Sequence, residues 1–374
     1  MPIKTLFSLL LFFNAAFAQT NSYLLIGTYT SGKSEGIYVY DFNSANADNK
    51  QISTVMVSNP SYLAVSPNKK IVYSVSENAD AVKTGVGGSV SALAFNKDNG
   101  SLTLINEQFS EGKHPCYVAV DKTGKWVFVA NYSSGSAAMY AVKEDGGIEP
   151  AKKVIQFEGT GFNKQRQEGP HAHSTVISPD NKYLFVQDLG LDKIMTYRFD
   201  DKMGTLTAAS KPFVKSVDGS GPRHLDFHPN KRNAYLIEEM TGTVVAFKYA
   251  NGNLQQIQRI SALQKDFKGD IGSADIHVSR DGKFLYCSNR GGSNDITIFK
   301  ISSNGKLTVA GRQSTMGKTP RNFNFDPTGN YLLAANQQSD EVVIFKVNRT
   351  TGLLKDTGKR ISVPNPVCIK WISK

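Results

Sequence analysis

Four ionisable side chains of this sequence could act together on a carbonyl group. They are His173, Arg223, Glu239 and Arg290, and each lies at the start or end of an apolar, strand-like run. Either His173 or Glu239 could deprotonate a water molecule that attacks a carbonyl carbon near neutral pH. The arginines could stabilise the charge on the carbonyl oxygen and bind a carboxylate or phosphate through paired hydrogen bonds. These residue types suit hydrolysis of a ring ester that carries an anionic group.

Other polar residues beside the same runs are candidates for substrate binding: His171, Asp188, His224, Asn131, Asn289 and Arg321. Some of them also have structural interpretations. His171 could bind the backbone of its loop, and Asp188 could pair with Lys193 or cap a turn. His224 alternates to the opposite face of its strand from Arg223 and could be structural.

No cofactor or metal is predicted. His171 and His173 with Asp188 are spaced so that they could hold a metal, but we favour the acid–base interpretation. The cysteines Cys116, Cys287 and Cys368 do not cluster as zinc ligands, and their odd number excludes a disulfide scaffold. Each lies in an apolar run, so we expect buried free thiols.

An internal repeat explains how residues so far apart in the chain could meet. Each copy has an alternating apolar run, a polar turn and a second apolar run, followed by two weaker strands, with a period of about 50 residues, which is typical of propellers. The clearest copies read NPSYLAVSPNKKIVYSVSEN, HPCYVAVDKTGKWVFVANY, GPHAHSTVISPDNKYLFVQDLG, GPRHLDFHPNKRNAYLIEEM, GSADIHVSRDGKFLYCSNRG and TPRNFNFDPTGNYLLAANQQ. Four short strands per copy predict an all-β protein in which each copy is one blade.

The two ends of the chain predict how the ring closes. The C-terminal NPVCIKWI matches a first strand, whereas SYLLIGTYT and GIYVYDF near the N-terminus match a second and a third strand. The C-terminal strand should therefore join the N-terminal blade, which gives a seven-bladed β-propeller without free sheet edges. We assign residues 19–374 to this single domain.

Aligning the copies places the chemical residues at equivalent positions. The first strands begin at Ser61, Cys116, His173, Arg223, Ala274 and Arg321, and the second strands end at Glu77, Tyr132, Leu189, Glu239, Arg290 and Gln337. Both positions should lie at one rim around the central axis. The apolar positions barely change between copies, whereas the residues at these two rim positions change completely. This difference indicates one specific site. The structural alternative for Glu239 and Arg290 is an ion pair between adjacent blades.

The ordered segments GTYT, EGPHAHS, QDLGLDK, GPRHLDFHPN, YLIEEM and SNRG resemble the lactonase family of seven-bladed propellers. That family includes the propeller-type 6-phosphogluconolactonases and the fungal carboxymuconate cycloisomerase. The resemblance implies a lactonase whose active-site residues are His173, Arg223, Glu239 and Arg290, the four that the repeat alignment selects. Alternatives are a lactonising cycloisomerase and a non-catalytic propeller that binds a protein or a glycan.

The first 18 residues are typical of a signal peptide. Lys4 precedes the apolar run LFSLLLFF, and Ala16-Phe17-Ala18 provides a cleavage site. We therefore expect export to the periplasm or the exterior, where a sugar lactone or aldonolactone is a rival substrate to a phosphorylated one. No other segment is long enough to span a membrane.

The net charge of +11 is spread along the chain without a basic cluster, so nucleic-acid binding is not expected. A basic background suits a small anionic sugar lactone. The sequence indicates no oligomeric state.

Overall fold

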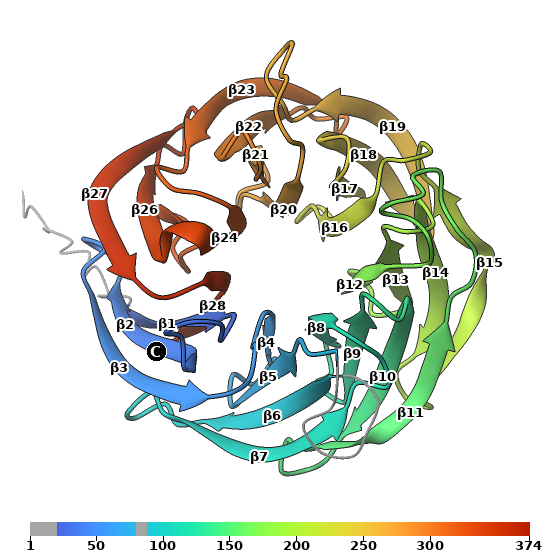
Figure 1. The fold of residues 1–374 in the computed structure, drawn as a ribbon, viewed down its shortest axis with the longest axis horizontal. Helices are drawn as coiled ribbons and strands as arrows, with labels where there is room; N and C mark the ends of the chain where they lie inside the picture. Colours follow the sequence, from blue (N-terminus) through green and yellow to red (C-terminus); the bar gives the residue numbers. More distant parts are fainter. Residues whose placement is uncertain (1–20, 80–87) are drawn as a thin grey trace, which may run out of the picture.

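The computed structural model describes residues 21–79 and 88–374, whose strands form seven antiparallel sheets of four strands each. The sheets stand side by side around a central axis (Figure 1). This ring confirms the all-β seven-bladed propeller that the repeat predicts. The predicted signal peptide, residues 1–18, lies outside the described residues.

Each sheet runs from an innermost strand at the axis to an outermost strand at the periphery. The innermost strands are β4 (Leu63–Val65), β8 (Pro115–Val120), β12 (Ala172–Ile177), β16 (Pro222–Phe227), β20 (Ser273–Val278), β24 (Pro320–Phe325) and β28 (Pro366–Ser373). The second strands are β5 (Ile71–Ser76), β9 (Trp126–Asn131), β13 (Tyr183–Asp188), β17 (Asn233–Glu238), β21 (Phe284–Asn289), β25 (Tyr331–Asn336) and β1 (Asn21–Thr28).

The third and fourth strands of each sheet continue from the second strand toward the periphery. The third strands are β6 (Ser89–Phe95), β10 (Ser136–Val142), β14 (Lys193–Asp200), β18 (Thr243–Ala250), β22 (Asp295–Ile301), β26 (Glu341–Val347) and β2 (Gly36–Asn43). The outermost strands are β7 (Leu102–Phe109), β11 (Ile148–Gln156), β15 (Thr205–Lys215), β19 (Asn253–Ser261), β23 (Leu307–Ser314), β27 (Leu354–Ser362) and β3 (Asn49–Met56). A short 3-10 helix, η1 (Gln337–Ser339), follows β25.

The ring closes through the two ends of the chain. β28, from the C-terminus, pairs antiparallel with β1, so that Leu25 faces Lys370 and Ile26 faces Ile369. β1, β2 and β3 supply the rest of that sheet. The predicted closure is confirmed, and it leaves no open strand edge between the first and last sheets.

The turn between the first two strands of a blade explains the Ser or Asp that recurs there. In five blades the side-chain oxygen of this residue accepts the backbone N–H five positions later, as Asp121 does from Trp126 at 2.9 Å and Ser279 from Phe284 at 2.9 Å. This local hydrogen bond closes the turn without a long loop. It holds the two strands in register, so the start of one and the end of the other reach the same rim.

The hydrophobic core lies between neighbouring sheets. Phe185 and Ile194 of one sheet, for example, pack against Leu225 and Leu236 of the next. The three cysteines are buried and free, as predicted. Within 21–79 and 88–374, no helix is long and apolar enough to cross a membrane.

Candidate active site

A β-bulge redirects the second residue of four of the inner strands. The pairing of β12 with β13 skips His173, and the pairing of β16 with β17 skips Arg223. The same break falls at Cys116 in β8 and at Arg321 in β24. A bulged residue leaves the regular alternation of the strand, so its side chain can point in a new direction. Together with Ser61 and Val367, all four line a small cavity of about 10 Å³ at the axis.

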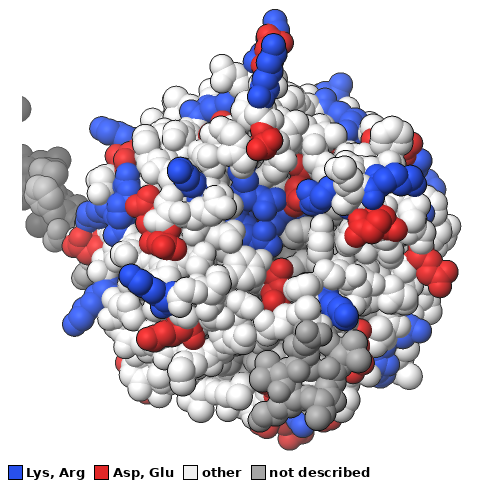
Figure 2. Space-filling model, in the orientation of Figure 1, with Lys and Arg blue, Asp and Glu red and all other residues white. Residues whose placement is uncertain are grey.

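A larger cavity of about 520 Å³ opens at the rim where the inner strands begin, and it shares Cys116, His173 and Arg321 with the small one. Figure 2 shows the face hollowed at its centre, with Lys and Arg side chains gathered in the hollow. The polar side chains in its wall include the predicted residues His173, Glu239, Arg290 and Arg321, together with Tyr29, Glu77, Tyr132 and Arg166. Arg223 lies just beneath, in the wall of the small cavity.

Glu239 is the centre of the charged cluster. Its Oε1 accepts a hydrogen bond from Nη2 of Arg166 at 2.8 Å. Its Oε2 lies 2.8 Å from Nε of Arg223 and 2.9 Å from Nη2 of Arg290. Nε2 of His173 lies 3.9 Å from the same Oε2. The other three predicted catalytic side chains, His173, Arg223 and Arg290, therefore all lie within 4 Å of the carboxylate of Glu239.

The protonation states in this cluster follow from burial and charge. Burial alone would raise the pKa of Glu239, but Arg290 and Arg223 outweigh it and hold this pKa well below its ordinary value. Burial and the charge of Arg223 hold the pKa of His173 well below its ordinary value. Burial also lowers the pKa of Arg290 to about 10, although Glu239 opposes the shift. Near neutral pH the cluster thus holds a carboxylate, guanidinium cations and a neutral imidazole.

The opposite wall of the cavity has a second charged group. The hydroxyl of Tyr29 donates to Oε2 of Glu77 at 2.8 Å, and the guanidinium of Arg321 lies 5.4 Å from the centre of the Tyr29 ring. Among the described residues Arg321 makes no hydrogen bond or ion pair. Its donors are therefore available to a ligand.

Charge does not balance around the cavity. Four guanidinium groups, from Arg166, Arg223, Arg290 and Arg321, face two carboxylates, from Glu77 and Glu239. The excess of two positive charges lies in a concave site, where the surrounding protein focuses the electric field and strengthens the attraction for an anion.

Several predicted substrate-binding residues do not line the large cavity. Asn131 and Asn289 are fully buried and donate to the backbone oxygens of Ser110 and Ala262. Oδ1 of Asp188 accepts the backbone N–H groups of His171 and Leu191, which is the turn-capping alternative. We assign these side chains to loop structure rather than to substrate binding, because each is turned away from the cavity and bonded to the chain.

His171 and His224 lie behind the wall of the cavity. The ring of His171 stacks on Tyr132, with ring centres 4.6 Å apart, and its Nδ1 lies 3.1 Å from the backbone oxygen of Tyr132. Nε2 of His224 lies 3.2 Å from Nη1 of Arg223. Both histidines therefore contact residues of the site and not the large cavity itself.

Some residues of the cavity wall were not among the predicted site residues. Glu77 and Tyr132 occupy the aligned strand-end position, and Tyr29 is its equivalent after β1, so the repeat alone contains the signal for all three. Arg166 comes from the loop between β11 and β12, which has no counterpart in the repeat. Within the part of the chain that the structure describes, no group of three or more His, Cys, Asp or Glu side chains is arranged to hold a metal ion.

Comparison with known proteins identifies the family. The family described as "Lactonase, 7-bladed beta-propeller" matches residues 23–371. The chain belongs to this family. The sequence is similar to 6-phosphogluconolactonase from Bacillus subtilis (strain 168), with 38% identity over 355 residues that cover 93% of this chain and 97% of the relative.

Two solved structures are similar to this chain over nearly its whole length. A putative 6-phosphogluconolactonase from Bacteroides fragilis NCTC 9343 has a TM-score of 0.89 and 42% identity, and the match covers 94% of this chain and 98% of the other. The periplasmic gluconolactonase of Pseudomonas aeruginosa has a TM-score of 0.90 and 36% identity, over 94% of this chain and 99% of the other. The family resemblance inferred from the sequence motifs is confirmed.

Proposed function

We propose that the cavity hydrolyses the lactone ring of an anionic sugar derivative. The observation that carries this proposal is the cluster at Glu239, where the guanidinium groups of Arg223 and Arg290 and the neutral imidazole of His173 surround one carboxylate. Support also comes from relatives named 6-phosphogluconolactonase and periplasmic gluconolactonase. A volume of about 520 Å³ is in the range of small-molecule sites.

His173 is the better candidate for the base. Both oxygens of Glu239 already accept hydrogen bonds from guanidinium groups, which compete with a water molecule for the same lone pairs. The neutral imidazole of His173 can take a proton from water, and the negative charge of Glu239 at 3.9 Å stabilises the imidazolium that forms. Glu239 then acts on the reaction through its charge and by holding the arginines.

Arg223 and Arg290 would stabilise the transition state. A water oxygen bonds to the lactone carbonyl carbon while its proton passes to His173, and the carbonyl oxygen becomes negatively charged. Guanidinium donors held in place before the reaction stabilise that charge without reorganising. The intermediate then collapses, the ring C–O bond breaks, and the ring oxygen takes the proton from His173. The product is an open-chain hydroxy acid.

Arg321 would bind the anionic group of the substrate. It is the guanidinium of the cavity without a carboxylate partner among the described residues, and the excess of two positive charges favours a substrate with a phosphate or carboxylate. The 6-phosphate of 6-phosphogluconolactone fits this requirement. A neutral gluconolactone would use the same catalytic cluster without this contact.

A lactone panel tests the proposal. Purified protein would be assayed at pH 6.5–7 against 6-phosphogluconolactone, gluconolactone and a carboxymuconate, with the spontaneous rate subtracted. We expect opening of the sugar lactones, and a rate at least about 100-fold lower for Glu239→Gln. Glu238→Gln is the matched control, because the adjacent buried Glu238 bonds to Arg259 away from the cavity. No acceleration by the wild-type protein, or equal rates for the two variants, would refute the proposal.

Export remains a proposal as well. It rests on the signal-peptide pattern of residues 1–18 and on the similarity to a periplasmic gluconolactonase. Expression of the full chain followed by cell fractionation and N-terminal sequencing tests it, with Gln19 expected as the first residue.

A further inference from the structure

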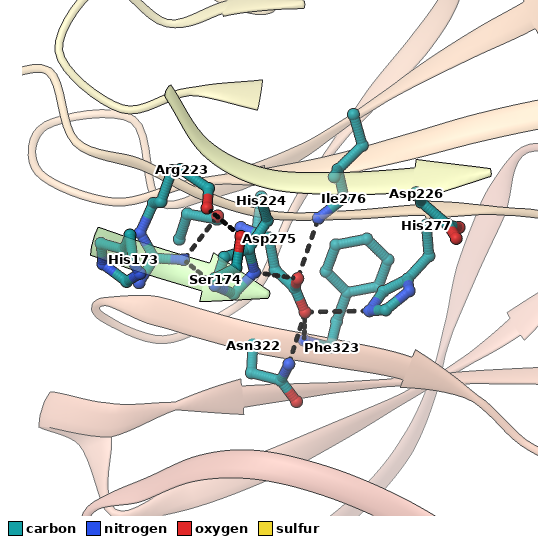
Figure 3. A network of polar contacts seen from close by, with 12 residues as sticks. His173, Ser174, Arg223, His224, Asp226, Asp275, Ile276, His277, Asn322 and Phe323 are labelled. Atoms are coloured by element: carbon teal, nitrogen blue, oxygen red, sulfur yellow. Dashed lines mark hydrogen bonds and ion pairs between the residues drawn. The ribbon is translucent and has the colours of Figure 1, made fainter. Parts of the chain in front are cut away.

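A buried chain of polar contacts runs from Arg223 along the axis of the propeller. His224 bridges Arg223 and Asp275, with Nε2 at 3.2 Å from Nη1 of Arg223 and Nδ1 at 2.7 Å from Oδ1 of Asp275. Oδ2 of Asp275 lies 2.9 Å from Nε2 of His277. Figure 3 shows Asp275 between the two imidazole rings, which come from β16 and β20. Asp275 is 1% exposed and stands outside both cavities described above.

The partners of His224 fix which of its nitrogens carries the hydrogen. A guanidinium can only donate, so Nε2 of His224 must accept from Arg223. Nδ1 is then the protonated nitrogen and donates to the carboxylate of Asp275. Burial and the charge of Arg223 lower the pKa of His224 to about 4, so the ring is neutral near pH 7.

Asp275 is itself held rigidly. Its Oδ1 also accepts the backbone N–H of Ile276 at 3.0 Å, and its Oδ2 accepts from the side-chain amide of Asn322 and from the backbone N–H of Phe323. Each of these contacts brings an N–H group to an oxygen of the Asp275 carboxylate. The carboxylate therefore has one orientation, and only a deprotonated carboxylate satisfies all the donors.

Arg223 is pinned by three acceptors. Its Nε donates to Glu239, and its Nη1 donates both to the backbone oxygen of Ala274 at 2.6 Å and to His224. The hydrogens on Nη2 have no acceptor among the described residues. A planar guanidinium fixed on one side presents its remaining donors in a single direction.

We propose that Asp275 is a positioning residue of this lactonase site: by fixing the tautomer of His224, it holds Arg223, and with it the free donors on Nη2, in one orientation beneath the large cavity. The proposal rests on the proposed function for its effect on turnover. Its geometry can be tested separately, through the imidazole nitrogens of His224. Asp275 itself touches neither cavity, so its effect should appear in kcat more than in KM.

Replacement of His224 separates positioning from packing. Gln at this position can accept from Arg223 through its oxygen and donate to Asp275 through its nitrogen, whereas Phe can do neither. We expect His224→Phe to lower kcat by about 100-fold with KM changed less than about threefold, and His224→Gln to recover at least about a tenth of the wild-type kcat. Equal kcat for the two variants, or wild-type kcat in His224→Phe, would overturn the proposal.

Nitrogen-15 NMR of histidine-labelled protein gives a readout that is independent of activity. The signals of His224 are identified by their absence in His224→Gln. In the wild type we expect a neutral ring with hydrogen on Nδ1, and in Asp275→Asn a changed ratio of the two tautomers together with a lower kcat. Asp226→Asn is the control, because Asp226 is a carboxylate of β16 that bonds to the backbone of Val278 and not to His224. It should alter neither the tautomer nor kcat.

The outcomes separate the two proposals. Hydrogen on Nε2 of wild-type His224 would refute the positioning role whatever the activity. The expected tautomer in a protein without lactonase activity would support the geometry and count against the proposed function. If Asp275→Asn does not fold, the comparison of His224→Phe with His224→Gln decides.

Discussion

Nε of Arg223 donates to Oε2 of Glu239 at 2.8 Å, and this ion pair joins the start of β16 to the end of β17 within one sheet. Arg223 is 1% exposed, so solvent and salt screen the pair only weakly. Replacing Glu239 would leave Arg223 buried without a carboxylate, which costs several kcal/mol. Replacing Arg223 by a neutral residue would remove one of the three cations that compensate the buried Glu239. A test of Arg223 in the chemical step therefore needs a variant that keeps its positive charge.

Arg223→Lys is such a variant. An ammonium cannot reach Glu239, the backbone oxygen of Ala274 and His224 together, and it has no planar fork to present to an oxyanion. We expect kcat to fall by about 100- to 1,000-fold, with a smaller change in KM, as for loss of an oxyanion donor. Steady-state kinetics on the lactone that the wild type opens would measure this.

Arg259→Lys is the matched control for that variant. Arg259 binds Glu238 through two hydrogen bonds of 2.8 and 2.6 Å in the same sheet, away from the cavity. The Arg259→Lys variant should be less stable than the wild type but should keep its kcat. A similar kcat for Arg223→Lys and the wild type would show that Arg223 does not act in the chemical step.

The pH dependence of the reaction should reflect His173. The folded protein holds the pKa of this imidazole well below 6.5, so the unprotonated base is still present at pH values where a free histidine is charged. The fall of kcat/KM on the acid side should therefore have its midpoint well below pH 6.5. Initial rates measured from pH 7.5 downward, corrected for spontaneous hydrolysis, would show it. A midpoint at or above 6.5 would exclude His173 in this environment as the base.

The repeat made much of the site predictable. His173 and Arg223 share one aligned position, and Glu239 and Arg290 share another. A single alignment therefore selects the carboxylate of Glu239 and three of the side chains that the structure places around it. The blade count and the closure by β28 were predictable for the same reason, because each blade repeats one strand pattern.

Other features had no signal in the repeat. Arg166 reaches Glu239 from a loop that follows no strand pattern, so only the folded chain shows where its side chain points. Asp275 bonds to a histidine of the neighbouring blade, and its role depends on which nitrogen of His224 carries a hydrogen. Asn131 and Asn289 were predicted to bind substrate because they lie one residue from the aligned rim position. In the structure their side chains turn back and bind the backbone instead.

Arg166 should add to the binding of an anionic substrate that Arg321 provides. Its guanidinium covers Oε1 of Glu239, yet the side chain is 46% exposed and can move to a ligand. We expect Arg166→Gln to raise KM for 6-phosphogluconolactone by about tenfold, the value of one charge-assisted hydrogen bond, and to affect a neutral gluconolactone less. Thermal stability should barely change, because the side chain is exposed.

Lys164→Gln is the control for this prediction. Lys164 is an exposed cation of the same loop that does not line the cavity, so its replacement removes the same charge without the contact. It should leave both KM values near those of the wild type. Equal KM increases for the anionic and the neutral lactone in Arg166→Gln would contradict a role in selecting the anion.

The ionised carboxylate of Asp188 should lower the stability of the folded protein at neutral pH. Burial raises its pKa from 3.8 to about 6, and its Oδ2 has no hydrogen-bond partner among the described residues. Between these two pH values the folded protein binds more protons at this site than the unfolded chain does. The contribution of Asp188 to stability is therefore fully present below about pH 4 and is lost as the pH rises through about 6.

Asp188→Asn removes that charge. Asn already occupies the equivalent position at Asn131, Asn289 and Asn336, so the blade accommodates its shape. We expect the variant to be more stable than the wild type by about 3 kcal/mol at pH 7, and the difference to be mostly gone at pH 4, since the wild-type carboxyl is then protonated in the fold. Urea unfolding of both proteins at the two pH values measures this difference directly and cancels the effects of all other titrating groups. A variant less stable than the wild type at pH 7 would mean that the hydrogen bonds from His171 and Leu191 need the carboxylate charge more than burial opposes it.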